Sequence, residues 1–151
     1  MMKGQFHLIA LIAASSTLFD PLAAHAGCLR FSPAESELSG SLEARTYPGP
    51  PNYEDIAEGD RAERAFVLKL DEPACVDADP KSETNSADQA GIREVHIRWF
   101  GGDLASLVGK RVVVRGQLAT ATIAHDRTAV VMDVTAARVQ ADGSLDRIQR
   151  L

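Results

Sequence analysis

The sequence predicts a mainly β domain, in which five strands close into a small barrel with one short helix, preceded by a cleaved signal peptide. Several segments alternate apolar and polar residues with a period of two, which is typical of half-buried strands. Gly116 lies inside a β-branched run, where a missing side chain marks a bend or a close backbone approach. A strand that bends at a glycine favours a closed barrel over the main alternative, a small open β-sandwich.

The first strand is expected over residues 37–46, where every second residue is apolar or small. The next eight residues, 47–54, contain three Pro and one Gly, which excludes both a helix and a sheet ladder. This stretch therefore predicts a stiff, ordered loop after the first strand.

The second strand is expected over residues 65–70, and Pro73 and Cys75 are expected to stop it. Residues 77–91 are polar and predict a surface excursion. The third strand is expected over residues 94–100.

A single helical turn is expected over residues 103–107, with Asp103 as its cap. The fourth strand should follow over residues 112–123 and the fifth over 130–139, joined by a polar connection. Five strands with a short helix between the third and the fourth is the order of an OB-type barrel, which we expect over residues 37–140. The remaining residues, 141–151, predict a C-terminal tail with one loose helical turn.

The N-terminus predicts export. Lys3 precedes an apolar run, and Ala24-His25-Ala26 offers small residues for cleavage, so residues 1–26 are interpreted as a signal peptide rather than a non-cleaved N-terminus. His25 stands where a lipid-attachment signal before Cys28 would have a large aliphatic residue, which favours a periplasmic or secreted chain without a lipid anchor. The apolar run is too short to span a membrane, so no membrane insertion is expected after cleavage.

The charge balance restricts the partners. Lys and Arg total 16 against 21 Asp and Glu, which gives a net charge of −5. A general nucleic-acid binder needs a basic face, and docking on an anionic membrane needs one too, so neither class of protein is favoured.

The chain has two cysteines, Cys28 and Cys75. In an oxidising compartment such a pair predicts a disulfide, which would tie residues 27–36 to the barrel. A metal pair or a redox pair is the alternative, but the chain has no Cys-x-x-Cys motif.

Two groups of motifs resemble a known family. The first is the run Tyr-Pro-Gly-Pro-Pro-Asn-Tyr-Glu at 47–54, followed by Gly59-Asp60 and Pro73-x-Cys75. The second is the pattern Leu-x-Gly-Lys-x-Val-x-Val-x-Gly-x-Leu at 107–118. Over residues 37–136 they resemble the bacterial family of domain of unknown function 4431. The resemblance implies an exported small barrel and brings no activity with it; the family pattern Gly-His-His-x-Thr is replaced at 124–128 by Ala-His-Asp-Arg-Thr.

Three groups of side chains are candidates for ligand binding. Tyr47, Asn52, Tyr53 and Glu54 predict either a recognition lip beside the barrel mouth or a plug of tyrosines under the proline loop. Arg98 shares the outer face of the third strand with His96 and Phe100, which predicts either a ligand face or a solvated surface.

The third group is His125, Asp126 and Thr128, which lie in one turn. They predict either a metal or proton site, or ordinary turn chemistry in which Asp126 bonds the backbone.

These observations favour an exported OB-like binding module that recognises a protein, a peptide or a small ligand, with no cofactor. The alternatives are a metal-dependent hydrolase or metal carrier that uses His125 and Asp126, and a purely structural role in an envelope assembly. The sequence contains no Gly-x-Ser-x-Gly motif, no His-Glu-x-x-His motif and no glycine-rich phosphate loop, so catalysis has no specific support.

Overall fold

The computed structural model describes residues 27–99 and 101–140. The predicted signal peptide, Phe100 and the predicted C-terminal tail lie outside the described residues. The described part contains six strands and two short 3-10 turns: β1 (Leu29–Arg30), β2 (Glu35–Pro48), η1 (Ile56–Glu58), β3 (Ala62–Asp77), β4 (Gln89–Trp99), η2 (Leu104–Leu107), β5 (Arg111–Thr120) and β6 (Val130–Val139).

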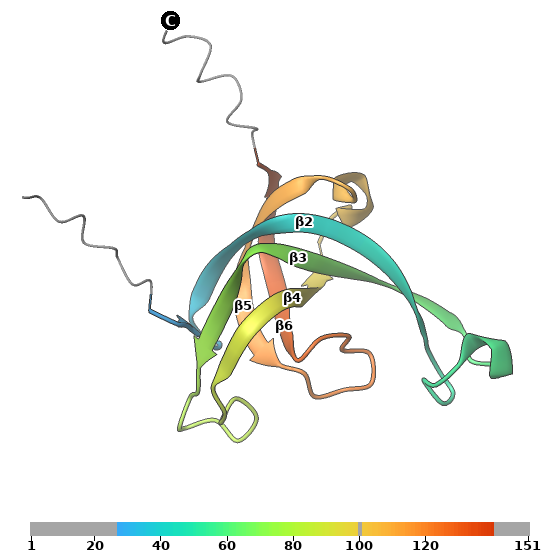
Figure 1. Cartoon of the computed structure of the whole chain (residues 1–151), viewed down its shortest axis with the longest axis horizontal. Helices are drawn as coiled ribbons and strands as arrows, with labels where there is room; N and C mark the ends of the chain where they lie inside the picture. The colour runs from blue at the N-terminus through green and yellow to red at the C-terminus, as the bar shows by residue number, and fades with distance from the viewer. Residues whose placement is uncertain (1–26, 100, 141–151) are drawn as a thin grey trace, which may run out of the picture.

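The sheet closes on itself. Its order is β3-β2-β5-β6-β4, and β4 pairs again with β3 to complete a five-stranded barrel, as Figure 1 shows. The pair β4–β6 is parallel and the other four pairs of the barrel are antiparallel. This is the connectivity of an OB-type barrel and confirms the fold class. The short β1 adds a parallel pair at the far end of β3.

The valine-rich strand β5 lies where the pattern predicted. Val112, Val114 and Leu118 point into the core, each 1% exposed or less. A side-chain carbon at Gly116 would lie 2.2 Å from the carbonyl oxygen of Asp133 on β6, so the two backbones approach too closely for any other residue. Gly40 of β2 has the same relation to β3. The predicted close approach at Gly116 is thus confirmed.

The predicted end of the second strand is wrong. β3 continues through Pro73 and Cys75 to Asp77. The β3–β4 register shifts between Lys69 and Ala74, so Pro73 sits in an irregular stretch where its missing N–H removes no ladder bond. The polar excursion is shorter than expected, because β4 already begins at Gln89.

Both helical turns are short 3-10 turns. The predicted turn before β5 is present as η2, and Asp103 caps it by accepting a hydrogen bond from the backbone N–H of Ala105 at 2.9 Å. The turn η1, within the loop after β2, was not predicted. β5 ends at Thr120, three residues before the expected end of the fourth strand.

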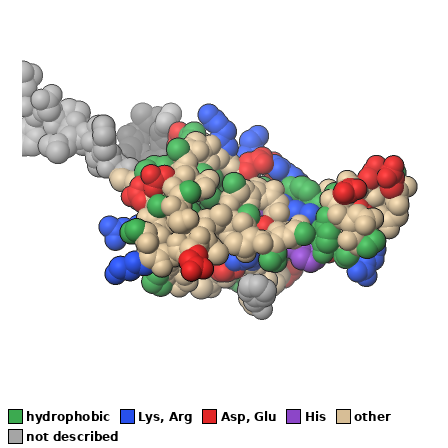
Figure 2. Space-filling model, turned by 90° about the horizontal axis from the view of Figure 1, so that it is seen from below, with side chains coloured by type: hydrophobic (Ala, Val, Ile, Leu, Met, Phe, Trp, Pro, Cys, Tyr) green, Lys and Arg blue, Asp and Glu red, His purple; other side chains and the backbone are tan. Residues whose placement is uncertain are grey.

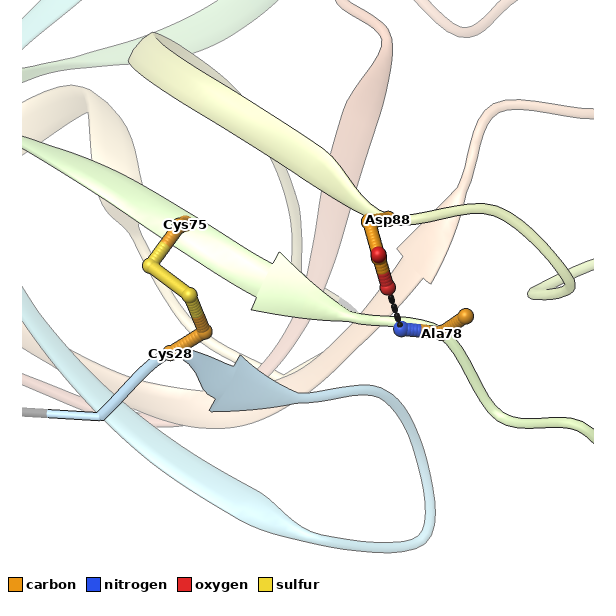
Figure 3. Close-up of a disulfide and its surroundings, with 4 residues drawn as sticks. All are labelled: Cys28, Cys75, Ala78 and Asp88. Atoms are coloured by element: carbon orange, nitrogen blue, oxygen red, sulfur yellow. Dashed lines mark hydrogen bonds between the residues drawn. A yellow bond between two sulfur atoms is a disulfide. The ribbon is translucent and has the colours of Figure 1, made fainter.

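The predicted disulfide is present. Cys28 and Cys75 are bonded, which ties the start of β1 to the end of β3 (Figure 3). Close by, the backbone N–H of Ala78 donates to Asp88 at 2.8 Å and closes the base of the polar excursion.

β2 and β3 extend beyond the barrel as a two-stranded arm, which we define as residues 45–65. Over Ala62–Ala65, β3 pairs with β2 alone, because the β3–β4 ladder begins at Phe66. Figure 1 shows this hairpin reaching away from the barrel body. The loop of residues 121–129 between β5 and β6, which we call the β5–β6 loop, approaches the base of the arm and positions the candidate site.

Candidate functional site

A buried carboxylate organises the tip of the arm. Asp60 is 5% exposed and accepts hydrogen bonds from the backbone N–H groups of Asn52 at 2.8 Å, Glu54 at 2.7 Å and Asp55 at 3.0 Å. Burial alone would raise the pKa of Asp60, but these donors outweigh it and lower the pKa below its usual value. Asp60 therefore holds the backbone of the proline loop from within.

Tyr53, which belongs to this loop, has an unusual backbone conformation. Its φ is 62°, a left-handed value that a bulky residue rarely adopts, and its N–H donates to the carbonyl of Gly49 at 2.9 Å. The phenol points at the β5–β6 loop, where its hydroxyl lies 2.9 Å from Nε2 of His125. The two rings meet edge to face, with centroids 5.1 Å apart.

The other nitrogen of His125 faces the arm. Its Nδ1 lies 2.9 Å from Oε2 of Glu63 on β3, and the same oxygen accepts a hydrogen bond from Arg127 at 2.6 Å. An ionised carboxylate only accepts, so Nδ1 carries a proton. In the neutral ring Nε2 then accepts from the hydroxyl of Tyr53. The imidazole thus joins the arm to the β5–β6 loop through both nitrogens.

Arg127 occupies the centre of this arrangement. Its guanidinium lies 5.0 Å from the ring centroid of Tyr47 and 5.9 Å from that of Tyr53. The side chain is 8% exposed, and its Nε has no hydrogen-bond partner among the described residues. Aromatic faces attract a cation held this way. Neither tyrosine belongs to the barrel core, so they hold Arg127 and do not plug the barrel.

We call this group the clasp; its members are Tyr47, Tyr53, Glu63, His125 and Arg127. Figure 2 shows histidine at the narrow junction between the body and the arm, and acidic side chains on the arm tip.

Beneath the clasp lies His96, which is buried at 9% exposure. Its ring Nδ1 accepts from the backbone N–H of Arg127 at 3.4 Å, and the backbone N–H of His96 donates to the hydroxyl oxygen of Thr128 at 2.7 Å. Burial lowers the pKa of His96; the charges of Arg98 and Arg127 lower it further, against the opposing charge of Asp126. The expected solvated face is therefore wrong at this position, because the β5–β6 loop covers it.

Arg98 and Asp126 neutralise each other inside the molecule. Arg98 binds both carboxylate oxygens of Asp133, at 2.8 and 2.9 Å, and lies 3.4 Å from Asp126. The Asp126 side chain is 1% exposed and accepts from the backbone N–H of Thr122 at 2.8 Å, as turn chemistry predicts. His125 and Asp126 thus face different partners. Over residues 27–99 and 101–140 no group of three His, Cys, Asp or Glu side chains is placed to hold a metal ion, and the metal alternative gains no support.

The predicted residues fall into three places. Tyr47, Tyr53 and His125 meet in the clasp, whereas Asn52 and Glu54 are exposed at the arm tip. Arg98 lies below the β5–β6 loop, and Thr128 is the part of that loop that contacts His96. Glu63 and Arg127 were not among the residues predicted from the sequence. The hairpin register sets Glu63 directly opposite Tyr47, so pairing the strands across the proline loop would have found it. No sequence signal distinguishes Arg127 beyond its place near His125.

A groove of about 470 Å³ lies beside the clasp, between the first part of β3 and the last part of β4. A neighbouring hollow of about 340 Å³ shares four of its lining residues. The shared residues are Arg64, Ala65, His96 and His125. The groove combines an apolar lining, to which Phe66 and Trp99 contribute, with polar side chains. These are Arg64, Arg98, His96, His125 and one carboxylate, Asp103.

Comparison with known proteins gives one match. Residues 101–140 match the family model described as Domain of unknown function (DUF4431). The match bears out the predicted resemblance over these residues, which contain the motif at 107–118. The DUF4431 match covers η2, β5, the β5–β6 loop and β6, and so includes His125 and Arg127 of the clasp. No curated protein and no solved structure matches the chain. In the described ranges, the structure has no helix of the length and apolarity that a membrane crossing requires.

Proposed function

We propose that this DUF4431 protein is an exported binding module whose recognition surface is the joint between the arm and the β5–β6 loop. The observation that carries the proposal is the contact of Tyr53 with His125, which joins two loops far apart in sequence. His125 also lines the groove, so the joint lies at its border. Loops are surface segments that tolerate change, and binding residues concentrate on loops that a rigid scaffold positions.

The position of the groove in the fold supports a binding role. In OB-type barrels, ligands bind on the second and third strands, between the first and the fourth connecting loops. In this chain those elements are β3, β4, the arm tip and the β5–β6 loop. The groove lies on that face, and its volume falls within the range of roughly 300–1,000 Å³ usual for ligand pockets.

The clasp prepares the surface for binding. The hydrogen bonds of His125 and the stacking of Arg127 fix the arm before any ligand arrives. A site that is already ordered loses little conformational entropy on binding, and affinity rises accordingly. The ligand that we propose for this surface is a protein, a peptide or a small molecule.

Two features support the cellular location that we propose. The predicted signal peptide directs export, and the disulfide between Cys28 and Cys75 is the kind of bond that persists in an oxidising compartment. We therefore place the module in the periplasm or outside the cell.

The test is a quantitative capture from periplasmic extract with wild-type protein and the variants Asn52→Ala and Tyr53→Ala. Lys81→Ala, exposed in the polar excursion at the opposite end of β3, is the matched control. We expect at least one protein or extract component that wild type and the control retain and that Tyr53→Ala loses. Equal recovery of every component by all four proteins would contradict the proposal.

A further inference from the structure

The edge of β3 that faces away from β2 is unpaired in the arm. Over Ala62–Ala65, β3 bonds to β2 on one side, and no ladder or backbone hydrogen bond of the described residues reaches its other side. β4 diverges here: Trp99 pairs with Val134 of β6 and not with β3. A strand edge with free N–H and C=O groups is a template for another extended chain.

The groove runs along this edge. Arg64, Ala65 and Phe66 line it from β3, and Ile97 and Trp99 line it from β4. It therefore occupies the wedge between the two diverging strands. Added strands gain affinity from main-chain hydrogen bonds and specificity from pockets for alternate side chains. Both parts are present: a free backbone edge and a lined groove beside it.

The cation in the groove is Arg64. It is exposed, its guanidinium lies 5.5 Å from the ring centroid of Phe66, and it forms no ion pair within residues 27–99 and 101–140. Arg98 and Arg127, by contrast, are already paired with carboxylates of the chain. An arginine that stacks on an aromatic ring and keeps its planar donors free is suited to bind a carboxylate with two hydrogen bonds.

We propose that an extended acidic peptide binds along Ala62–Ala65 as an added strand, with a carboxylate on Arg64 and a neighbouring apolar side chain against Phe66 and Trp99. The inference rests on the proposed binding function and names its ligand class. Side chains two positions apart share one face of a strand, so the peptide needs acidic and apolar residues in that local arrangement.

Trp99 provides the readout, because it is the only tryptophan of the chain. The probe is an acetylated, amidated hexapeptide, Thr-Glu-Thr-Phe-Thr-Glu, in which Phe lies two positions from each Glu, titrated to millimolar concentration against the full mature chain. The comparison probes are the same peptide with Lys for Glu, the same peptide with alternate amides N-methylated, and benzoate as a small carboxylate. We expect the acidic peptide to change Trp99 fluorescence in a saturable way. The Lys peptide and the N-methylated peptide should bind at least tenfold more weakly, and benzoate should not saturate in this range.

The variant Arg64→Gln should weaken the acidic peptide at least tenfold, and Lys81→Gln should bind as wild type does. Arg64 is exposed and unpaired, so its variant should fold, which circular dichroism verifies. Hydrogen exchange should show new protection of the Arg64 amide when the peptide is bound.

Three results would overturn the inference: no saturable signal from the acidic peptide, equal binding by Arg64→Gln, or equal binding by the N-methylated peptide or benzoate. If the capture experiment still shows loss of a component in Tyr53→Ala, the binding module stands and only the peptide class fails. If both experiments fail, the binding module fails too.

Discussion

The hydroxyl of Tyr53 lies 2.9 Å from Nε2 of His125, although 72 positions separate the two residues. The contact joins the arm to the β5–β6 loop outside the barrel core. It therefore sets the direction of the arm relative to the barrel and contributes little to the folding of the barrel itself.

Replacement of the Tyr53 hydroxyl tests whether the contact orients the arm without stabilising the barrel. The variant Tyr53→Phe should lower the free energy of unfolding by less than about 1 kcal/mol, because a partly exposed hydrogen bond contributes little net stability. A double-mutant cycle with His125→Gln, followed by urea denaturation, should show coupling of about 0.5–1 kcal/mol. Strictly additive effects would mean that the contact is absent in solution.

Gly116 is one of two barrel positions, with Gly40, where an added side chain would meet the backbone of the next strand. Because a Cβ would lie 2.2 Å from a carbonyl oxygen of β6, Gly116→Ala must push two strands apart. We expect a loss of at least about 2 kcal/mol in the free energy of unfolding. Gly101→Ala is the matched control, since its added carbon meets nothing within 4 Å. Equal midpoints for the two variants in urea would refute the close approach.

The disulfide closes 47 residues of chain. In the chain-entropy model such a loop stabilises the folded state by about 4 kcal/mol. The double variant Cys28→Ser, Cys75→Ser should therefore unfold at a markedly lower urea concentration than the oxidised protein. The oxidised protein treated with a reductant should reach the same midpoint as the double variant. If reduction leaves the midpoint unchanged, the bridge has no role in stability.

The lowered pKa of His96 predicts that the protein loses stability in acid. In the folded protein its pKa is lowered from 6.5, so the unfolded chain binds the proton more readily. The contribution of the neutral ring is complete above pH 6.5 and is lost as the pH falls below it. The difference in unfolding free energy between wild type and His96→Gln should narrow from pH 7.5 to pH 5.0. The control His125→Gln should retain the acid loss that His96 causes, and a constant difference for His96→Gln would contradict the assignment.

Asp60 is expected to hold the arm tip. In Asp60→Asn the side chain can present only one acceptor oxygen to the three backbone donors of the loop. The amides of Asn52, Glu54 and Asp55 should exchange with solvent faster, whereas those of β5 should not change. Hydrogen exchange followed by NMR measures both, and uniform acceleration would indicate general destabilisation instead.

Much of the barrel is readable from the sequence because its signals are local. The run Val112–Val114, the interruption at Gly116 and the cap Asp103 each fix a neighbouring backbone conformation, and all three have the predicted place. The predicted strand end at Pro73 was wrong because a proline within a strand is tolerated where the register is irregular. The register depends on the partner strand, which local sequence does not reveal.

Only part of the site can be predicted from the sequence, because its contacts join segments that are far apart along the chain. Tyr47, Tyr53 and His125 are conspicuous residue types, but their meeting depends on how two loops fold across the barrel. Arg127 resembles any surface arginine in the sequence and becomes central only because two tyrosines and Glu63 surround it. Burial of His96 likewise comes from a loop more than 25 positions away.

The turn η1 at the end of the arm buries none of its own side chains. Substitutions in η1 should therefore leave the stability of the barrel almost unchanged. The outer end of the arm can accept a different surface chemistry, such as a label or an added charge, while the strands that form the barrel keep their packing.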